Sequence, residues 1–167
     1  SIQYPGTKKN NWVGKSFAPN KNVKAQLVAT DQWDFRPTFG SELIDAGASI
    51  PDYPHKIVGA APDIGAYEFG DTNYWIPGHR TLQAQSPIPP INSVSAKPDL
   101  DLMWLPASDI AVNHIYWGRS ASALKKVGVS QGESNIFDIV SAVGPMKNGE
   151  TYFQRANVTN PMSSAHA

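Results

Sequence analysis

The sequence DFRPTFGSELIDAG extends from Asp34 to Gly47, and APDIGAYEFG follows it from Ala61 to Gly70. Both stretches contain apolar bursts of strand length, and each burst has a Gly or Pro close by. This pattern predicts short strands joined by tight turns. We therefore expect β-structure in this part of the chain.

The composition of the whole chain agrees with an all-β protein. The 167 residues include 13 Gly, 14 Pro and 5 Trp, and only 17% of them are charged. These values suit short strands and many turns better than long, solvated helices. The apolar fraction of 41% is enough to build a core, so disorder is not the default expectation.

Charge and cysteine content exclude several classes of function. The 14 basic and 14 acidic residues cancel, so the sequence carries no electrostatic footprint for nucleic acid or for an anionic membrane. The lack of Cys excludes disulfides, thiolate metal sites and a cysteine nucleophile. No apolar run approaches the roughly 18 residues of a membrane span, and Ser1–Pro5 lacks the layout of a secretory signal. If the protein is exported, we expect its signal to lie upstream.

After Gly70 the sequence predicts a linker and then a second domain. Residues 71–90 have the Pro-rich, Gly-rich and polar composition of a linker. Beyond them, Leu100, Leu102 and Trp104 alternate with mixed positions, which predicts a half-buried strand. No helix is expected, apart from at most one turn over Ser120 to Val127. Further strands are predicted at sandwich-like spacing over Asn113–Gly118, Ser134–Asp138 and Glu150–Val158.

The two stretches quoted first resemble the closing coils of bacterial right-handed parallel β-helix proteins. That group includes the choice-of-anchor Q surface proteins and many β-helix polysaccharide lyases and hydrolases. Its pattern reads D-F-R-x-x-x-G-S-x-x-I-D-A-G and then D-I-G-A-Y-E. The resemblance implies that Leu43, Ile44 and Ile64 stack inward on a preceding coil, while Gly40, Gly47 and Gly65 permit the corners.

The same resemblance implies roles for other residues before Gly70. Asp45 and Asp63 are expected to accept hydrogen bonds from backbone N–H groups at the corners, and Tyr67 and Phe69 to form part of a cap. At roughly 20 to 25 residues per coil, this segment holds at most about three coils. The catalytic coils of such a parent enzyme are expected upstream. An open coil end also predicts an upstream β-helix segment or a companion chain that covers it, or self-association.

The second half resembles a fibronectin type III or related immunoglobulin-like module. The resemblance implies that Trp104 lies in the core and that Tyr152 is the corner tyrosine. The sequence departs from the family pattern at Gln154 and Ala156, which replace large inward residues, and a convincing final strand is missing. The stretches that carry the resemblance are DLDLMWLPA (99–107), NHIYWG (113–118) and GETYFQRANV (149–158).

The predicted fold class is therefore all-β. Residues 1–70 are expected to form terminal β-helix coils and their cap, residues 71–90 a linker, and residues 91–167 a small immunoglobulin- or fibronectin III-like β-sandwich. This sandwich is either incomplete in the chain, or its last edge is covered by another segment. No catalytic site is predicted within the chain. The first 30 residues resemble no family.

Acidic and basic pairs allow catalysis as an alternative. Glycoside hydrolysis needs two carboxyl groups roughly 5 to 10 Å apart, and a lyase needs a base near an Arg or a metal. Corner hydrogen bonds and solvated loop charge are the favoured explanation of these residues. The acidic pairs are Asp31 with Asp34, Asp45 with Asp63, and Glu68 with Asp71; the basic pairs are His55 with Lys56, and His79 with Arg80.

Metal and cofactor binding find little support in the sequence. The four His residues lack close spacing, so no zinc site and no other metal site is predicted. Calcium stays open as a weak alternative, because four acidic residues lie in turns or at strand edges. These residues are Asp31, Asp34, Asp99 and Asp101.

Aromatic residues suggest carbohydrate binding, because the apolar faces of sugar rings stack on exposed Trp and Tyr side chains. Tyr74 and Trp75 lie in the predicted linker and are the expected exposed pair; the alternative is that they pack the linker onto a neighbouring domain. Tyr116 is expected to point opposite to Trp117, which we assign to the core. The predicted carbohydrate-binding residues are thus Tyr74, Trp75 and Tyr116.

These expectations combine into one leading hypothesis. The chain is a non-catalytic C-terminal accessory region of an extracellular or cell-surface β-helix enzyme, a lyase or glycoside hydrolase, and its partner is a polysaccharide. One alternative is a small standalone lyase or hydrolase that uses the Asp and His residues. Another is a structural surface-attachment module without a ligand.

Overall fold

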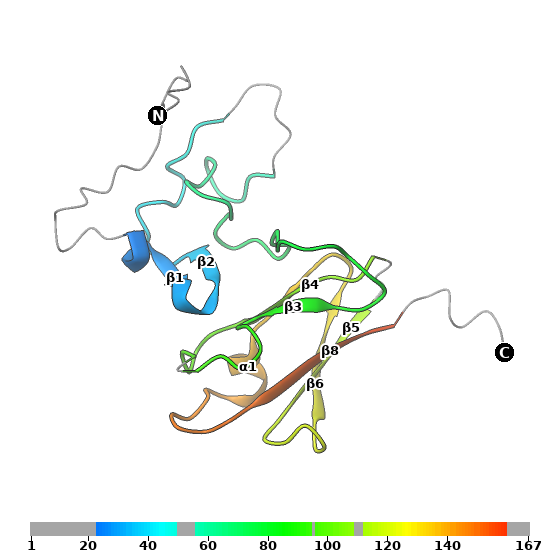
Figure 1. The fold of residues 1–167 in the computed structure, drawn as a ribbon. Coiled ribbons are helices and arrows are strands. Elements are labelled where there is room, and N and C mark those ends of the chain that lie inside the picture. Colours follow the sequence, from blue (N-terminus) through cyan, green and yellow to red (C-terminus); the bar gives the residue numbers. More distant parts are fainter. Residues whose placement is uncertain (1–22, 50–55, 95, 109–111, 160–167) are drawn as a thin grey trace, which may run out of the picture. The chain divides into compact units, whose positions relative to one another are not determined.

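The computed structural model contains mostly short strands in small antiparallel sheets, with very little helix (Figure 1). The prediction of an all-β protein is confirmed. Within the part of the chain that the structure describes, no helix is long and apolar enough to cross a membrane. The described residues are 23–49, 56–94, 96–108 and 112–159.

The chain divides into two compact units. The first comprises Ser1–Thr30 and Asp34–Asp71, and the second comprises Asp31–Trp33 and Thr72–Ala167. Each unit has its own set of hydrogen bonds and is described separately below.

The first unit has one antiparallel hairpin. A 3-10 helix, η1 (Val23–Gln26), leads directly into β1 (Leu27–Ala29). A second 3-10 helix, η2 (Thr30–Gln32), follows β1 in the chain and precedes β2 (Asp34–Pro37), and its residues Asp31 and Gln32 are assigned to the second unit. The two strands pair antiparallel, and a bulge interrupts their register. The rest of the described unit consists of loops and turns.

A buried ion pair explains the first letters of the D-F-R motif. Residues two apart on a strand share a face, and Arg36 donates from Nε and Nη2 to the two carboxylate oxygens of Asp34 at 2.9 and 2.7 Å. Asp34 is fully buried, and a buried carboxylate needs such pairing. Burial, followed by the charge of Asp34, raises the pKa of Tyr67 above its ordinary value of 10.0.

Acidic side chains hold the loops of the first unit by accepting backbone hydrogen bonds. Asp45 Oδ1 accepts from the N–H groups of Ala60 and Ala61 at 2.7 and 3.0 Å. Asp63 Oδ1 accepts from the N–H of Asp45 at 2.7 Å, and Glu68 Oε1 accepts from the N–H of Asp63 at 3.1 Å. The expectation that Asp45 and Asp63 accept hydrogen bonds from backbone N–H groups is confirmed.

The two halves of the motif run antiparallel where they pair. Ile64 N–H donates to Leu43 O at 2.9 Å, and Gly47 N–H donates to Pro62 O at 2.7 Å. The two stretches thus run in opposite chain directions where they pair, whereas strands in neighbouring coils of a parallel β-helix run in the same direction. In the described part of this unit no parallel coil is seen.

The first unit buries only part of its apolar surface. Leu43 is buried, while Ile44 and Ile64 are half-buried. Phe39 is 89% exposed, and Phe35 on β2 is also exposed. The inward stacking predicted for the three aliphatic residues is thus complete for Leu43 alone.

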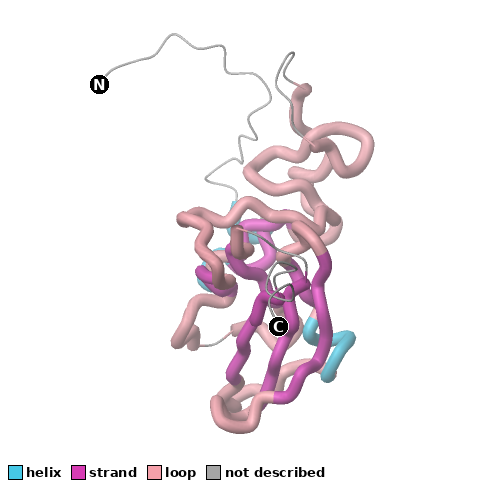
Figure 2. Tube along the Cα trace, turned by 90° about the vertical axis from the view of Figure 1, so that its right-hand side faces the viewer, coloured by secondary structure: helices cyan, strands magenta, loops and turns pink. Residues whose placement is uncertain are grey.

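The second unit consists of two three-stranded antiparallel sheets, and Figure 2 shows the long strands side by side. In the first sheet the order is β3-β4-β7, and in the second it is β6-β5-β8, so β8 is an edge strand. The strands are β3 (Gln85–Ile88), β4 (Leu102–Leu105), β5 (Val112–Gly118), β6 (Lys125–Gln131), β7 (Ile136–Phe137) and β8 (Phe153–Thr159).

The two sheets share one hydrophobic core. Leu102 and Trp104 from β4 pack with Ile115 from β5 and with Ile139. Gly128 on β6 faces Phe137 on β7, and an added Cβ at this position would overlap the Phe137 ring. The absence of a side chain at Gly128 thus leaves room for the Phe137 ring of the first sheet.

Tyr152 marks the corner before β8. Its hydroxyl accepts a hydrogen bond from the backbone N–H of Lys147 at 2.9 Å and donates to Glu150 Oε2 at 3.0 Å. Its ring stacks on Trp117 with centroids 5.1 Å apart, and the Arg119 guanidinium lies 4.4 Å from the ring centroid of Tyr152. The corner is thereby fixed to β5.

Two sequence expectations for this unit are wrong. Residues 120–127 were expected to hold at most one helical turn, but β6 begins within them. A short helix, α1 (Ile139–Val143), was not expected; Asp138 caps it by accepting from the N–H of Ser141 at 2.9 Å. Ile139 is fully buried, so core packing stabilises this single turn.

The strand predicted around Trp104 exists, but it is not half-buried. Met103 and Leu105 are as deeply buried as Leu102 and Trp104. The outer face of β4 is covered because residues 72–78, part of the predicted linker, lie against it. Asn135, which precedes β7, links that segment to β4 by hydrogen bonds.

Candidate functional site

The segment before Gly78 is fixed to the first sheet by Asn135. The Asn135 side chain accepts from Tyr74 N–H at 2.7 Å and donates from Nδ2 to Tyr74 O at 2.8 Å and Trp104 O at 2.9 Å. Its backbone N–H also donates to Thr72 O at 3.0 Å. Asn135 is fully buried, so these bonds form in a medium where an unpaired amide is costly.

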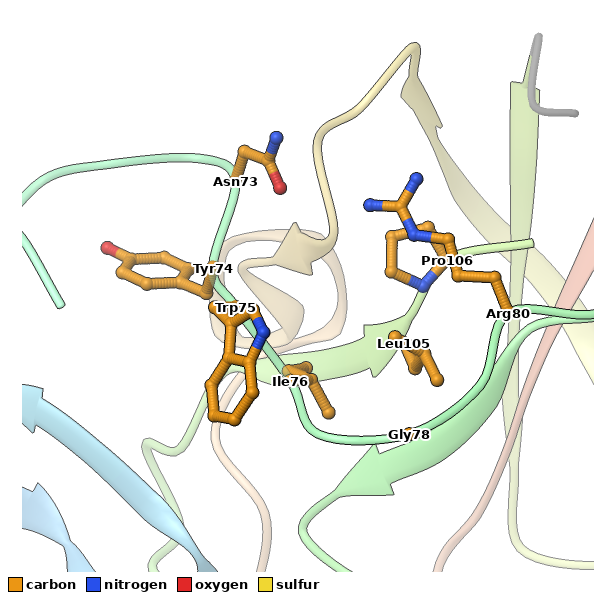
Figure 3. Close-up of a pocket in the computed structure, with 8 residues that line it drawn as sticks. All are labelled: Asn73, Tyr74, Trp75, Ile76, Gly78, Arg80, Leu105 and Pro106. Atoms are coloured by element: carbon orange, nitrogen blue, oxygen red, sulfur yellow. The ribbon is translucent and has the colours of Figure 1, made fainter. Parts of the chain in front are cut away.

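The two aromatic residues at this hydrogen-bonded position, Tyr74 and Trp75, lie in different environments. Tyr74 is only 5% exposed, whereas Trp75 is 69% exposed. In Figure 3 the Tyr74 ring points away from Arg80, and the indole of Trp75 stands in front of the segment. The expectation that both rings of this pair are exposed is met by Trp75 alone.

A groove of about 360 Å³ opens beside Trp75. Ile76, Leu105 and Pro106, which are almost fully buried, form its apolar floor, and Figure 3 draws Ile76 and Leu105 between the Trp75 ring and the Arg80 side chain. The remaining lining residues are Asn73, Tyr74 and Gly78. An aromatic platform, an apolar floor and a few polar groups at the rim form a common pattern of ligand sites.

Gly78 allows the groove segment to approach β4. Its φ is 147°, and a Cβ added there would lie 2.6 Å from Leu105 Cδ2. A side chain at this position would therefore meet Leu105 and adopt a strained backbone conformation. The shape of the groove depends on glycine at this turn.

Arg80 supplies the positive charge of the groove. Its Nη1 and Nη2 atoms both lie 3.2 Å from Glu133 Oε2. The side chains are 41% and 61% exposed, so the pair is open to solvent and contributes little to stability. The Arg80 guanidinium can exchange this partner for another anion.

Tyr116 does not belong to the groove. It lies on β5 between Lys126 of β6 and Arg155 of β8, and none of these residues lines the groove. The Arg155 guanidinium lies 4.8 Å from the centroid of the Tyr116 ring, and the ring is half-buried. One face of Tyr116 thus carries a cation, which leaves it less suited than Trp75 to stack on a sugar.

The structure assigns structural partners to most of the acidic residues considered for catalysis. Asp34 is paired with Arg36, and Asp45, Asp63 and Glu68 accept backbone hydrogen bonds. Asp71 forms an ion pair with Lys56.

The remaining candidates give no cluster. His79 is exposed beside Arg80, and His55 lies outside the described residues. Within the described ranges no group of three His, Asp or Glu side chains is placed to hold a metal ion, and this includes the four acidic residues considered for calcium.

Sequence reasoning missed three components of the site. Asn135 lies within the predicted strand Ser134–Asp138, which gives it no role of its own, yet it holds the backbone of Tyr74, next to Trp75, from 61 residues away. Leu105 and Pro106 seemed to be strand and turn residues, and they form the groove floor. The only available signal was the isolated aromatic pair in a Pro-rich and Gly-rich stretch.

Comparisons with protein-family models, with curated proteins and with solved structures gave no match to this chain. The function is therefore argued from the geometry of the groove.

Proposed function

We propose that the second unit binds carbohydrate in the groove beside Trp75. The observation that carries the proposal is an indole ring that is 69% exposed although its segment is held by a buried Asn. Sugar rings present apolar C–H faces that pack on flat aromatic rings. A platform that is already fixed loses little conformational freedom on binding, which favours affinity.

The number of atoms in one sugar indicates that the groove binds each sugar weakly. A hexose residue has about 11 non-hydrogen atoms, and at about 0.3 kcal/mol per atom it contributes about 3.3 kcal/mol, a Kd in the millimolar range. Weak single contacts suit an accessory module that acts on a polymer, because many equivalent sites along one chain raise the apparent affinity.

We extend the proposal to the setting of the module. The chain acts as a non-catalytic accessory region of an extracellular β-helix enzyme that degrades polysaccharide, a lyase or glycoside hydrolase. Support comes from the D-F-R to A-Y-E motif, whose two halves are joined by hydrogen bonds from Asp45 N–H to Asp63 Oδ1 and from Ile64 N–H to Leu43 O. In this proposal the first unit closes the end of an upstream β-helix, and its exposed Phe39 packs against that β-helix.

The second unit is proposed to be a fibronectin type III-like module. The sheet orders β3-β4-β7 and β6-β5-β8 suit such a module without its last strand. The buried Trp104 and the hydrogen bond between Lys147 N–H and the Tyr152 hydroxyl are further support.

Affinity electrophoresis through polysaccharide gels tests the binding proposal. The intact chain and a Trp75→Ala variant are run through gels that contain neutral or acidic polysaccharides. The matched control is Trp33→Ala, because Trp33 is also exposed, at 63%, and does not line the groove. We expect retardation in at least one gel, its loss in Trp75→Ala and its retention in Trp33→Ala.

Three other outcomes would overturn the proposal. Equal retardation of Trp75→Ala and the unaltered chain would place binding elsewhere, and no retardation in any gel would favour a structural module without a ligand. Release of reducing ends or unsaturated products by the isolated chain would favour a standalone enzyme.

A further inference from the structure

We infer that the groove selects acidic polysaccharides, and that Arg80 reads the carboxylate of a uronate residue next to the sugar stacked on Trp75. This inference rests on the proposed function and specifies its ligand. The groove offers one cation and one platform, and both line the same cavity.

The ion pair with Glu133 does not use the full hydrogen-bonding capacity of the Arg80 guanidinium. Both terminal nitrogens approach a single oxygen, Oε2 of Glu133, at 3.2 Å. A planar carboxylate that meets both nitrogens with both oxygens makes two parallel, shorter hydrogen bonds, which is the geometry that favours Arg over Lys. A ligand carboxylate can therefore make a better pair than Glu133 does.

Exposure makes the exchange feasible. More than half of the Glu133 side chain is exposed, and such surface pairs hold their geometry weakly. Glu133 can swing into solvent when a ligand carboxylate arrives. Its charge also repels that carboxylate, so Glu133 limits the affinity of the groove for acidic chains.

Trp75 and Arg80 both line the groove, as does the apolar surface of Ile76 and Leu105. Ile76 and Leu105 lie between the indole of Trp75 and the side chain of Arg80, as Figure 3 shows. One ring can stack on Trp75 while the next ring passes over the apolar floor and presents its carboxylate to Arg80. A neutral chain can make the first contact but not the second.

The test compares polygalacturonate with its methyl ester, which has the same sugar backbone without the charge. Retardation of the intact chain is measured for both polymers and for a sulfated polysaccharide. The variants are Arg80→Gln, Glu133→Gln and Trp75→Ala. Lys125→Gln is the charge-matched control, since it removes one positive charge from an exposed position of β6 outside the groove.

We expect the unaltered chain to bind the acid form at least about tenfold more tightly than the ester, in line with one bidentate Arg contact. Arg80→Gln should abolish this preference, so that the acid form and the ester are retarded equally. Glu133→Gln should strengthen binding to the acid form about threefold or more and leave the ester unaffected. Lys125→Gln should behave like the unaltered chain.

The outcomes separate this inference from the proposed function. If Trp75→Ala removes all binding while Arg80→Gln keeps the preference for the acid form, carbohydrate binding stands and the role of Arg80 is refuted. If Trp75→Ala binds normally, the proposed function fails. If Lys125→Gln loses the preference for the acid form as fully as Arg80→Gln does, Arg80 does not bind the carboxylate specifically. Tighter binding to the sulfated polymer than to polygalacturonate would contradict carboxylate binding by Arg80 as well.

Discussion

Replacement of Asn135 by Ala should destabilise the second unit strongly. The change removes three hydrogen bonds of 2.7 to 2.9 Å and leaves the Tyr74 N–H and two carbonyl groups without the buried partner they now have. At about 1 kcal/mol for each bond, the free energy of unfolding should fall by about 3 kcal/mol. Because a small domain has only about 5–15 kcal/mol of stability, this loss is large.

Asn113 provides a matched control for this prediction. It is also a fully buried Asn, on β5, but among the described residues neither its Oδ1 nor its Nδ2 finds a hydrogen-bond partner. Replacement of Asn113 by Leu removes an unpaired amide at similar volume, so stability should change by less than about 1 kcal/mol or increase.

Urea unfolding of the full chain, followed by far-ultraviolet circular dichroism, measures both effects. With a slope of about 2 kcal/mol per molar urea, Asn135→Ala should lower the midpoint of the transition by about 1.5 M. The reasoning is refuted if Asn135→Ala unfolds within about 0.3 M of the unaltered chain, or if Asn113→Leu loses as much as Asn135→Ala.

Two further predictions concern the second unit. Gly128→Ala places a Cβ against the Phe137 ring and should cost about 1–3 kcal/mol; a urea midpoint equal to that of the unaltered chain would disprove close contact between the sheets at this point. Asp138→Ala removes the N-cap of α1 and should cost about 1 kcal/mol at neutral pH. Hydrogen bonds from Ser141, its side chain first, lower the pKa of Asp138 from the ordinary 3.8, so this contribution is complete above that value and is lost as the pH falls through the lowered pKa. The thermal unfolding curves of the variant and the unaltered chain should converge in acid, and a gap that persists there would count against the carboxylate cap.

The strands of the second unit that were predicted from the sequence share a clear signal. Asn113–Gly118 and Glu150–Val158 alternate well, and the structure places β5 and β8 there. The strand β6 was missed, because its two Val residues stand among Lys, Gly and polar residues and give no continuous apolar face. Alternation identifies a strand only when the inward side is consistently apolar.

The first unit shows what a motif can and cannot predict. The motif correctly indicated that Asp45 and Asp63 accept backbone hydrogen bonds, because such bonds are local and follow from residue type. It did not indicate the antiparallel pairing of Leu43 with Ile64. Pairing direction depends on how the loop between the two stretches returns, and that path is not encoded in either stretch.

The groove was predictable only in part for a similar reason. Trp75 stood out as an aromatic residue in a polar stretch, but the burial of Tyr74 depends on Asn135, which is 61 residues away in the sequence. Arg80 was noted as part of a basic pair, and its partner Glu133 lies 53 residues away. Long-range hydrogen bonds of single residues leave no periodic trace in a sequence.

The central claim is that Trp75 is the platform on which a sugar ring stacks. The most direct measurement follows the indole N–H signals of the five tryptophans by nuclear magnetic resonance while an oligosaccharide is added to the full chain. The Trp75→Ala variant assigns the signal of Trp75, and Trp33→Ala assigns that of Trp33. The account predicts that the Trp75 signal moves in a saturable way while that of Trp33 stays in place. A Trp75 signal that does not move while another indole signal does would contradict it.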